Sequence, residues 1–399
     1  YKFSKILYRR FMKMAFFIGR DREARRSYGF DEVALVPGRV TINPKDVDIS
    51  SSIGGLKLNI PIIASAMDGV VDAKFAVEMG KIGGLAVLNT EGVQVRYDDA
   101  EKVIEELVKA DPKDATKLIQ QIYSEDIKEG LITKRIKEIK SQGVAASVSV
   151  LPKKAEEYGE IAVKAGVDIL FVQSTVTTAM HHSSEYKMVD FKTICSKLKV
   201  PVVIGNTVGY DAALDLMESG CAGILVGIGP GAACTTRGVL GMGVPQVTAT
   251  VDCASARDYY FKKTGRYCSI ITDGGMNVSG DICKAIACGS DAVMIGSALA
   301  RAIEAPGKGY HWGMATPDRN LPRGTRIQVG TTVNLKNIIV GPAVVDDGSQ
   351  NLAGALRISM GSLGAKNIKE MQLVEIIIAP DIKSEGKVYQ KAQKLGMGK

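Results

Sequence analysis

Residues 223–246 read Gly-Ile-Leu-Val-Gly-Ile-Gly-Pro-Gly-Ala-Ala-Cys-Thr-Thr-Arg-Gly-Val-Leu-Gly-Met-Gly-Val-Pro-Gln. The apolar run Gly223–Val226 predicts a buried strand of a parallel sheet, and a glycine-rich polar loop around Cys234 follows it. Thr235–Arg237 would surround the sulfur with donors and a positive charge, a setting that favours the nucleophilic thiolate. The alternative is an unreactive cysteine in a tight turn. The glycines and the Thr-Thr-Arg run favour the nucleophile.

Other short apolar runs of this kind alternate with amphipathic, helix-like stretches such as 154–165, 211–219 and 281–287. The expected strands are 61–64, 84–88, 145–150, 168–172, 201–204, 223–226, 269–272 and 291–295. Eight strands alternating with helices predict an α/β fold, the (β/α)8 TIM barrel. The alternative is an open doubly wound sheet, which would require a Gly-x-Gly-x-x-Gly turn after its first strand. No such turn occurs there.

Within this fold we expect a single catalytic barrel domain over residues 28–380. The connection after the second strand is too long for an ordinary loop-helix-loop, so 90–142 is predicted to hold two or three extra helices. Residues 309–342 follow the eighth strand, are rich in Gly, Pro, Arg and Thr, and suit a mobile flap or a disordered loop. Residues 1–27 are expected to form a partly disordered extension, and 381–399 a tail.

The composition limits the classes of partner and compartment. A net charge of +8 without a long basic run does not indicate nucleic acid, and it suits an anionic small substrate. Cysteine occurs seven times, without a Cys-x-x-Cys pair, which argues for a reducing, cytoplasmic setting and against a disulfide or zinc scaffold. No apolar run reaches about 18 residues, so no membrane span is expected.

Chemistry in such a barrel lies at the carboxyl ends of the strands, and nearly every predicted end carries polar or glycine residues. Gly296 and Ser297 would end the last strand and open a helix, so their backbone N–H groups predict a phosphate site, although Ser297 also suits a helix N-cap. The Asp273 carboxylate would accept hydrogen bonds from ribose hydroxyls. The candidate site residues at these ends are Ser65, Met67, Gln173, Ser174, Thr175, Asn206, Gly227, Asp273, Gly274, Gly275, Gly296 and Ser297.

At this point the sequence resembles the IMP dehydrogenase/GMP reductase family over residues 28–369. The matching segments are 30–38, 65–68, 227–246, 272–275, 292–299 and 354–363. In that family a cysteine attacks C2 of the purine and a covalent thioimidate forms. The dehydrogenase makes it from IMP by hydride loss to NAD and hydrolyses it to XMP. The reductase makes it from GMP by loss of ammonia and reduces it with NADPH to IMP.

The resemblance implies a role for each matching residue. Cys234 would be the nucleophile, and Thr236 would help to activate water. The purine nucleotide monophosphate would be held by Ser65, Met67, Asn206, Asp273, Gly274, Gly275, Gly296, Ser297, His311 and Met314. The dinucleotide would lie near Gln173, Ser174, Thr175 and Gly227. The carbonyl groups of Gly229, Gly231 and Cys234 would bind a monovalent cation, K+, and the family implies a homotetramer.

The chain also departs from the family pattern. The regulatory CBS domains that usually follow the second strand are absent from that connection, as in the short branch of the family. Ala232 replaces a serine, His311 replaces a tyrosine, and Gln173 replaces the acid that usually holds the nicotinamide ribose. The Arg-Tyr pair of the dehydrogenase flap has no match. Arg323 and Arg326 are therefore the candidates for the base that activates water, with Arg323 preferred.

Three functions remain open from the sequence. The Gly243–Gln246 and Gly354–Leu363 segments look more like those of dehydrogenases, and we favour conversion of IMP to XMP with NAD. The absence of CBS domains resembles GMP reductases, which makes reduction of GMP with NADPH the alternative. A regulator that binds purine nucleotides without catalysis is the second alternative. For the replacement at His311, two roles remain open: the imidazole donates to phosphate, or it faces water.

Overall fold

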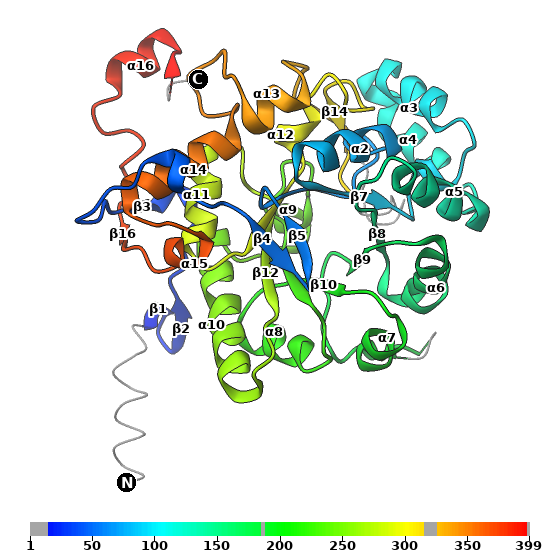
Figure 1. Ribbon diagram of the computed structural model, residues 1–399, viewed down its shortest axis with the longest axis horizontal. Helices are drawn as coiled ribbons and strands as arrows, with labels where there is room; N and C mark the ends of the chain where they lie inside the picture. The colour runs from blue at the N-terminus through cyan, green and yellow to red at the C-terminus, as the bar shows by residue number, and fades with distance from the viewer. Residues whose placement is uncertain (1–14, 185–187, 315–324, 397–399) are drawn as a thin grey trace.

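The computed structural model describes residues 15–184, 188–314 and 325–396 (Figure 1). Eight parallel strands close into a barrel in the order β10-β11-β12-β13-β6-β7-β8-β9, and β9 pairs with β10. The strands are β6 (Ile62–Ala64), β7 (Leu85–Asn89), β8 (Ser147–Val150), β9 (Ile169–Gln173), β10 (Val202–Thr207), β11 (Gly223–Val226), β12 (Ser269–Asp273) and β13 (Ala292–Ile295). The (β/α)8 barrel is thus confirmed, with all eight strands close to their expected positions.

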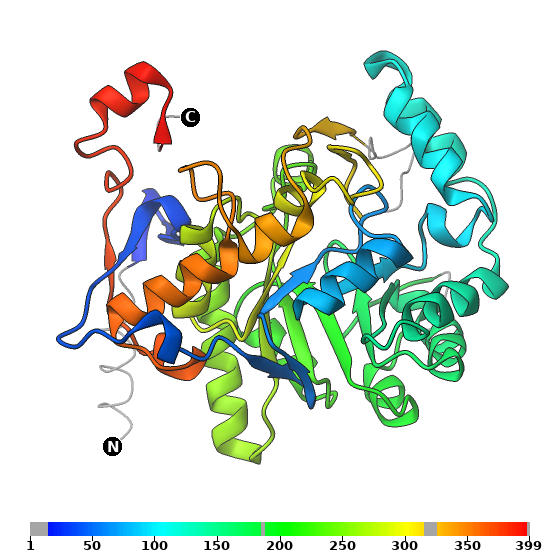
Figure 2. The same ribbon diagram turned by 45° about the horizontal axis from the view of Figure 1, so that its top comes forward.

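Helices surround this barrel (Figures 1 and 2). The helices that follow successive strands are α2 (Ala73–Ile82), α5 (Glu129–Lys140), α6 (Ala155–Ala165), α7 (Phe191–Lys197), α8 (Tyr210–Met217), α10 (Gln246–Thr264), α11 (Ser279–Ala287) and, after the last strand, α12 (Ser297–Ala300), α13 (Leu335–Val340) and α14 (Leu352–Leu363). Their apolar faces and the outward-facing strand residues form one large buried core. This layering explains why the strands read as continuous apolar runs, since both faces of each strand are covered.

The barrel interior is filled by a second apolar cluster. It includes Val87 of β7, Phe171 of β9 and Leu225 of β11, all fully buried. Ile53 enters the cluster from the hairpin of β4 (Ser51–Ile53) and β5 (Leu56–Leu58), which closes the amino-terminal end of the barrel. The carboxyl-terminal end is left free for polar side chains, which is where such barrels hold their sites.

The long connection after β7 contains α3 (Ala100–Lys109), α4 (Pro112–Ile122) and α5. Helix α5 packs on both α2 and α6, so it occupies the ordinary helix position of its βα unit. Helices α3 and α4 are therefore the extra ones, and they form a separate apolar cluster at one side of the molecule. Both figures show them in cyan beside the barrel. The sequence predicted two or three added helices, and the structure has two.

Chain segments outside the predicted barrel elements pair over long sequence distances. Strand β16 (Ile376–Ile378) pairs with β3 (Val33–Leu35), so a segment that precedes the first barrel strand forms a strand that its sequence did not indicate. The extension forms a hairpin of β1 (Ala15–Gly19) and β2 (Arg22–Arg25), and Arg25 pairs with Asp252 of α10 at 2.5 Å. The short helices α15 (Ile368–Met371) and α16 (Val388–Gln393) complete the chain.

Of the predicted flap 309–342, residues 315–324 lie outside the described residues, and the described parts on either side are joined by a strand pairing that the sequence did not predict. Strand β14 (Tyr310–His311) pairs with β15 (Ile327–Gln328), and α13 follows. In the described parts of the chain, no helix has the length and apolar character needed to cross a membrane.

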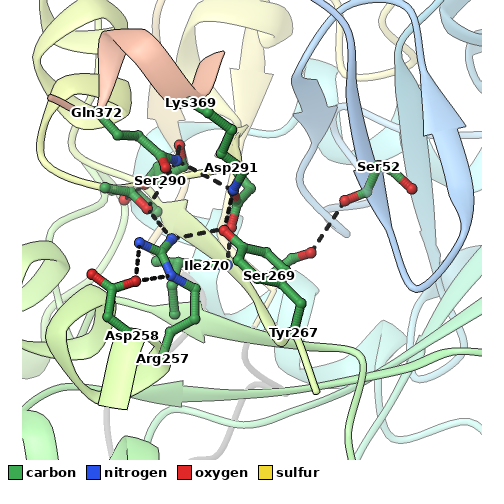
Figure 3. A network of polar contacts seen from close by, with 12 residues as sticks. Ser52, Arg257, Asp258, Tyr267, Ser269, Ile270, Ser290, Asp291, Lys369 and Gln372 are labelled. Carbon is green, nitrogen blue, oxygen red and sulfur yellow. Dashed lines mark hydrogen bonds and ion pairs between the residues drawn. The ribbon is translucent and has the colours of Figure 1, made fainter. Parts of the chain in front are cut away.

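A buried polar network joins elements at the amino-terminal side of the barrel (Figure 3). The carboxylate of Asp291, just before β13, accepts from the Ile270 N–H at 2.8 Å and the Tyr267 hydroxyl at 2.8 Å. It pairs with Arg257 of α10 at 3.4 Å and with Lys369 of α15 at 2.5 Å. The network ties one barrel helix and the C-terminal region to the start of two strands. Its place at this end of the barrel indicates a role in stability.

Candidate active site

The carboxyl-terminal ends of the strands enclose a cavity of about 260 Å³. Its walls are formed by the carboxyl ends of six strands, by loops that follow them and by the segment 311–314. Thr325 also lines the cavity. The predicted residues that line it are Ser65, Met67, Gln173, Ser174, Thr175, Asn206, Gly227, Gly229, Gly231, Cys234, Thr236, Asp273, Gly274, Gly275, Gly296, Ser297, His311 and Met314. Tertiary folding therefore brings together residues that are up to about 250 positions apart in the chain.

Cys234 lies on the loop between β11 and α9 (Thr236–Leu240). Its thiol is 3.2 Å from the Thr236 hydroxyl, and its N–H donates to the Gly231 carbonyl at 3.0 Å. Gly229 has φ of 71°, and a Cβ there would lie 2.7 Å from Cγ of Arg237, so a side chain would be strained and would clash. The loop thus presents the sulfur to the cavity through a tightly packed turn.

The role expected of Arg237 needs a correction for its hydrogen-bond donors. Its guanidinium does not line the cavity, and its donors bond the carbonyls of Ile228 at 3.2 Å and Val244 at 2.9 Å. Burial lowers the pKa of Arg237, and a charge interaction with Cys234 opposes this shift, so the positive charge does lie near the sulfur as predicted. The side chain therefore ties the two ends of the loop together. Its N–H groups bond these carbonyls and do not point at the sulfur as the sequence had suggested.

All seven cysteines are free; Cys234 is exposed, Cys195 is half-buried and the other five are buried. Burial raises the pKa of Cys195, Cys253 and Cys288 to about 12, so these thiols stay protonated near neutral pH. Cys234 thus differs from the other six cysteines in its exposure and in its place beside the Thr236 hydroxyl.

On the far side of the loop, Gln246 joins two strand ends in a way that its sequence position did not reveal. Its amide nitrogen donates to the carbonyls of Val226 at 3.2 Å and Asp273 at 2.9 Å. Gln246 is 3% exposed. The signal in the sequence that could have indicated this role is a glutamine at the start of a helix, directly after a glycine-rich loop. Its role is to hold the ends of β11 and β12 at a fixed spacing.

Asp273 and Asn206 meet across the cavity. The Asn206 amide donates to the Asp273 carboxylate at 2.7 Å. Burial raises the pKa of Asp273 to about 6, and the Asn206 contact opposes that shift. Asp273 is thus an acceptor that ionises within reach of physiological pH, at the position expected for ribose.

The expected phosphate end of the cavity carries Gly296, Ser297 and His311. The His311 Nε2 lies 2.9 Å from the Ser297 hydroxyl, and His311 is 1% exposed, which excludes a histidine that faces water. Burial lowers the pKa of His311 to about 4, so the imidazole is neutral near pH 7. Helix α12 is a single turn, so backbone N–H groups contribute more here than an extended helix dipole would.

Gln173 ends β9 with its amide in the cavity. Its nitrogen donates to the Met314 sulfur at 3.3 Å, and its oxygen is buried without a hydrogen-bond partner among the described residues. Since buried acceptors are rarely left unpaired, this oxygen suits a donor from a bound molecule. The adjacent Ser174 and Thr175 also line the wall.

The two arginine candidates have different positions. Arg323 lies outside the described residues. Arg326 is described but does not line the cavity. Its guanidinium donates to the Val108 carbonyl at 3.2 Å and the Ala110 carbonyl at 2.9 Å, at the end of α3. The structure therefore brings every described site residue of the prediction to the cavity except Arg326.

The barrel and this cavity, which holds an accessible loop cysteine, have the arrangement of a (β/α)8-barrel enzyme. The sequence model of the "IMP dehydrogenase / GMP reductase domain" matches residues 27–316, and the chain belongs to this family of oxidoreductases. An uncharacterized oxidoreductase of Mycolicibacterium smegmatis is 39% identical over 90% of this chain and 99% of its own length. The inosine-5'-monophosphate dehydrogenase of Methanocaldococcus jannaschii is 30% identical over 88% of this chain and 92% of its own.

A solved structure is also similar. The crystal structure of an IMP dehydrogenase/GMP reductase-like protein from Corynebacterium glutamicum has a TM-score of 0.87 and 36% identity. The match covers 93% of this chain and all of that one. The fold and the family inferred from the residues are therefore both confirmed.

Proposed function

We propose that the protein is an IMP dehydrogenase that oxidises IMP to XMP with NAD through a covalent thioimidate on Cys234. The observation that carries the proposal is the exposed thiol 3.2 Å from the Thr236 hydroxyl, in a cavity that also holds the Asp273 carboxylate and the Ser297–His311 pair. These groups match a nucleophile, a ribose acceptor and a phosphate site in one enclosure.

The reaction has two steps at purine C2. The Cys234 thiolate would add to this carbon, which would lose its hydride to the bound dinucleotide and remain attached to the sulfur as a thioimidate. Water then adds to the same carbon and loses a proton, and the carbon–sulfur bond breaks to return the thiolate and release XMP. Bound NAD supplies the hydride acceptor. Its fit is supported by the unpaired Gln173 oxygen in the cavity wall.

We assign the water-activating base to Arg323, with Thr236 beside the sulfur as its partner. Arginine is a weak base in water because its pKa exceeds about 12, and a dry site makes the neutral form more accessible. The alternative candidate, Arg326, has its donors on helix carbonyls. Arg323→Lys should leave the burst of hydride transfer intact and slow hydrolysis, so that the adduct accumulates. Loss of the burst and of steady-state turnover together would contradict this assignment.

A monovalent cation such as K+ fits the carbonyls of the Cys234 turn. The Cys234 N–H donates to the Gly231 carbonyl at 3.0 Å, so these two residues belong to one turn, and the resemblance to the family adds the Gly229 carbonyl. By similarity to the family, we also propose that the protein forms a homotetramer and acts in the cytoplasm. Activity that rises with K+ and not with Li+ would support the site.

The decisive assay supplies IMP with NAD and GMP with NADPH in separate reactions and follows the absorbance of the reduced nicotinamide. We expect turnover of the first pair, loss of that turnover in Cys234→Ala, and retained IMP binding in that variant. Turnover of GMP with NADPH alone would assign the reductase reaction. Binding of either nucleotide without turnover would assign a regulator.

A further inference from the structure

Trp312, the only tryptophan in the chain, is buried outside the barrel core. It directly follows β14, lines the catalytic cavity and is 3% exposed. Its ring packs in the cluster formed by the α3–α4 insertion, which includes Ile104, Leu107 and Ile119. A residue of the cavity wall thus has its apolar partners in the insertion.

A chain of polar contacts runs through the same place. The Trp312 indole N–H donates to the Tyr123 hydroxyl at 2.7 Å, and this hydroxyl donates to the Asp68 carboxylate. Asp68 is fully buried and comes directly after Met67, which lines the cavity. Tyr123 is the C-cap of α4, so one residue of the insertion connects two segments of the cavity wall.

Burial raises the pKa of Asp68, and the Tyr123 hydroxyl opposes that shift by stabilising the carboxylate. Removal of this hydroxyl would leave the buried carboxylate and the indole N–H each short of one hydrogen bond, and an unpaired buried polar group is costly. The Asp68 carboxylate is also packed closely against the backbone of Gly92, since a Cβ there would fall 2.2 Å from it. The chain of contacts therefore has little freedom to rearrange.

A second attachment lies beyond the first. Arg326 donates to the carbonyls of Val108 and Ala110 at 3.2 and 2.9 Å, and also to that of Leu107. Its guanidinium lies 4.6 Å from the centre of the Tyr310 ring. Cations at the carboxyl end of a helix are favourable, because they satisfy its unpaired carbonyls. Figures 1 and 2 both show α3 beside β14.

We propose that the α3–α4 insertion holds the 310–314 segment in register with the cavity, with Tyr123 as a positioning residue for catalysis. This inference rests on the proposed function. Met314 contacts Gln173 at 3.3 Å, on the dinucleotide side, while His311 is held separately by Ser297. Displacement of Trp312 should therefore disturb the reacting end more than the phosphate end. Because small misplacements near reacting groups are costly, we expect kcat to fall about tenfold or more.

The test compares Tyr123→Phe with Tyr97→Phe. Tyr97 is in the same insertion and its hydroxyl donates to the Ile122 carbonyl at 3.1 Å, so the control loses a hydroxyl contact that does not involve the cavity wall. Tyr123→Phe should lower kcat about tenfold while the IMP KM changes less than about twofold. Tyr97→Phe should keep the wild-type kcat. Trp312→Phe should resemble Tyr123→Phe, and the double variant should lose no more than either single one.

Trp312 fluorescence gives a readout that does not depend on turnover. Acrylamide quenching should be low in the wild type and in Tyr97→Phe, and should rise in Tyr123→Phe. If the wild type turns over neither substrate pair, the proposed function fails, and quenching still tests the positioning. Unchanged quenching and kcat in Tyr123→Phe would overturn the inference, as would an equal loss of kcat in Tyr97→Phe or additive losses in the double variant.

Discussion

Replacing Asp291 should destabilise the barrel without altering its chemistry. The side chain is 3% exposed, and its main charged partner, Arg257, is 5% exposed (Figure 3). Asp291→Asn keeps the size of the side chain but leaves the guanidinium buried without this counter-charge. Removing one partner of a buried pair costs about 3–5 kcal/mol. The ion pair with Lys369 adds little, since that lysine is 57% exposed.

This cost can be converted to a shift in melting temperature. An unfolding entropy of about 2.1 cal/mol/K per residue over 399 residues gives a shift of about 4–6 °C. Differential scanning calorimetry at a fixed scan rate measures it. The kcat and KM of the folded enzyme should match the wild type at 25 °C, because the network lies at the end of the barrel opposite the cavity.

Asp258→Asn is the matched control. Asp258 also contacts Arg257, at 2.8 Å, but is 68% exposed, so its removal should cost less than about 1 kcal/mol. If Asp291→Asn melts within about 1 °C of the wild type, the buried pair does not contribute as the structure suggests. Equal shifts in both variants would show that burial is not the cause.

Three further predictions concern the cavity. Gly296→Val puts a Cβ 2.1 Å from the Met67 Cε, and overpacking of this kind should raise the IMP KM about tenfold, with little effect on the NAD KM; equal effects would move the phosphate elsewhere. Because the pKa of Asp273 is raised to about 6, its carboxylate is lost as pH falls through 6, so kcat/KM for IMP should fall below pH 6 and level off above it, and Asp273→Asn should flatten that profile. Iodoacetamide should label Cys234 first and IMP should protect it, as peptide mass analysis can check; labelling that IMP does not reduce would separate the thiol from the nucleotide site.

The apolar runs and the glycine-rich loop were sufficient to predict the barrel and most of its site. Strands covered on both faces show as short continuous apolar runs, and the ends of such strands converge whatever their separation in sequence. This is why Ser65, Asp273 and Ser297 could be assigned to one site before any contact was known. The local motif around Cys234 was enough to single out this cysteine as the candidate nucleophile, and the structure shows that it is exposed.

Contacts between distant segments were decided only by the tertiary structure. The pairing of β16 with β3 and the attachment of Trp312 to Tyr123 join residues with no shared local pattern. The donors of Arg237 and Arg326 were similarly unpredictable, because a guanidinium bonds whichever carbonyls folding brings within reach. Sequence periodicity reports which face of an element is buried, whereas the identity of the partner across that face depends on how the elements pack.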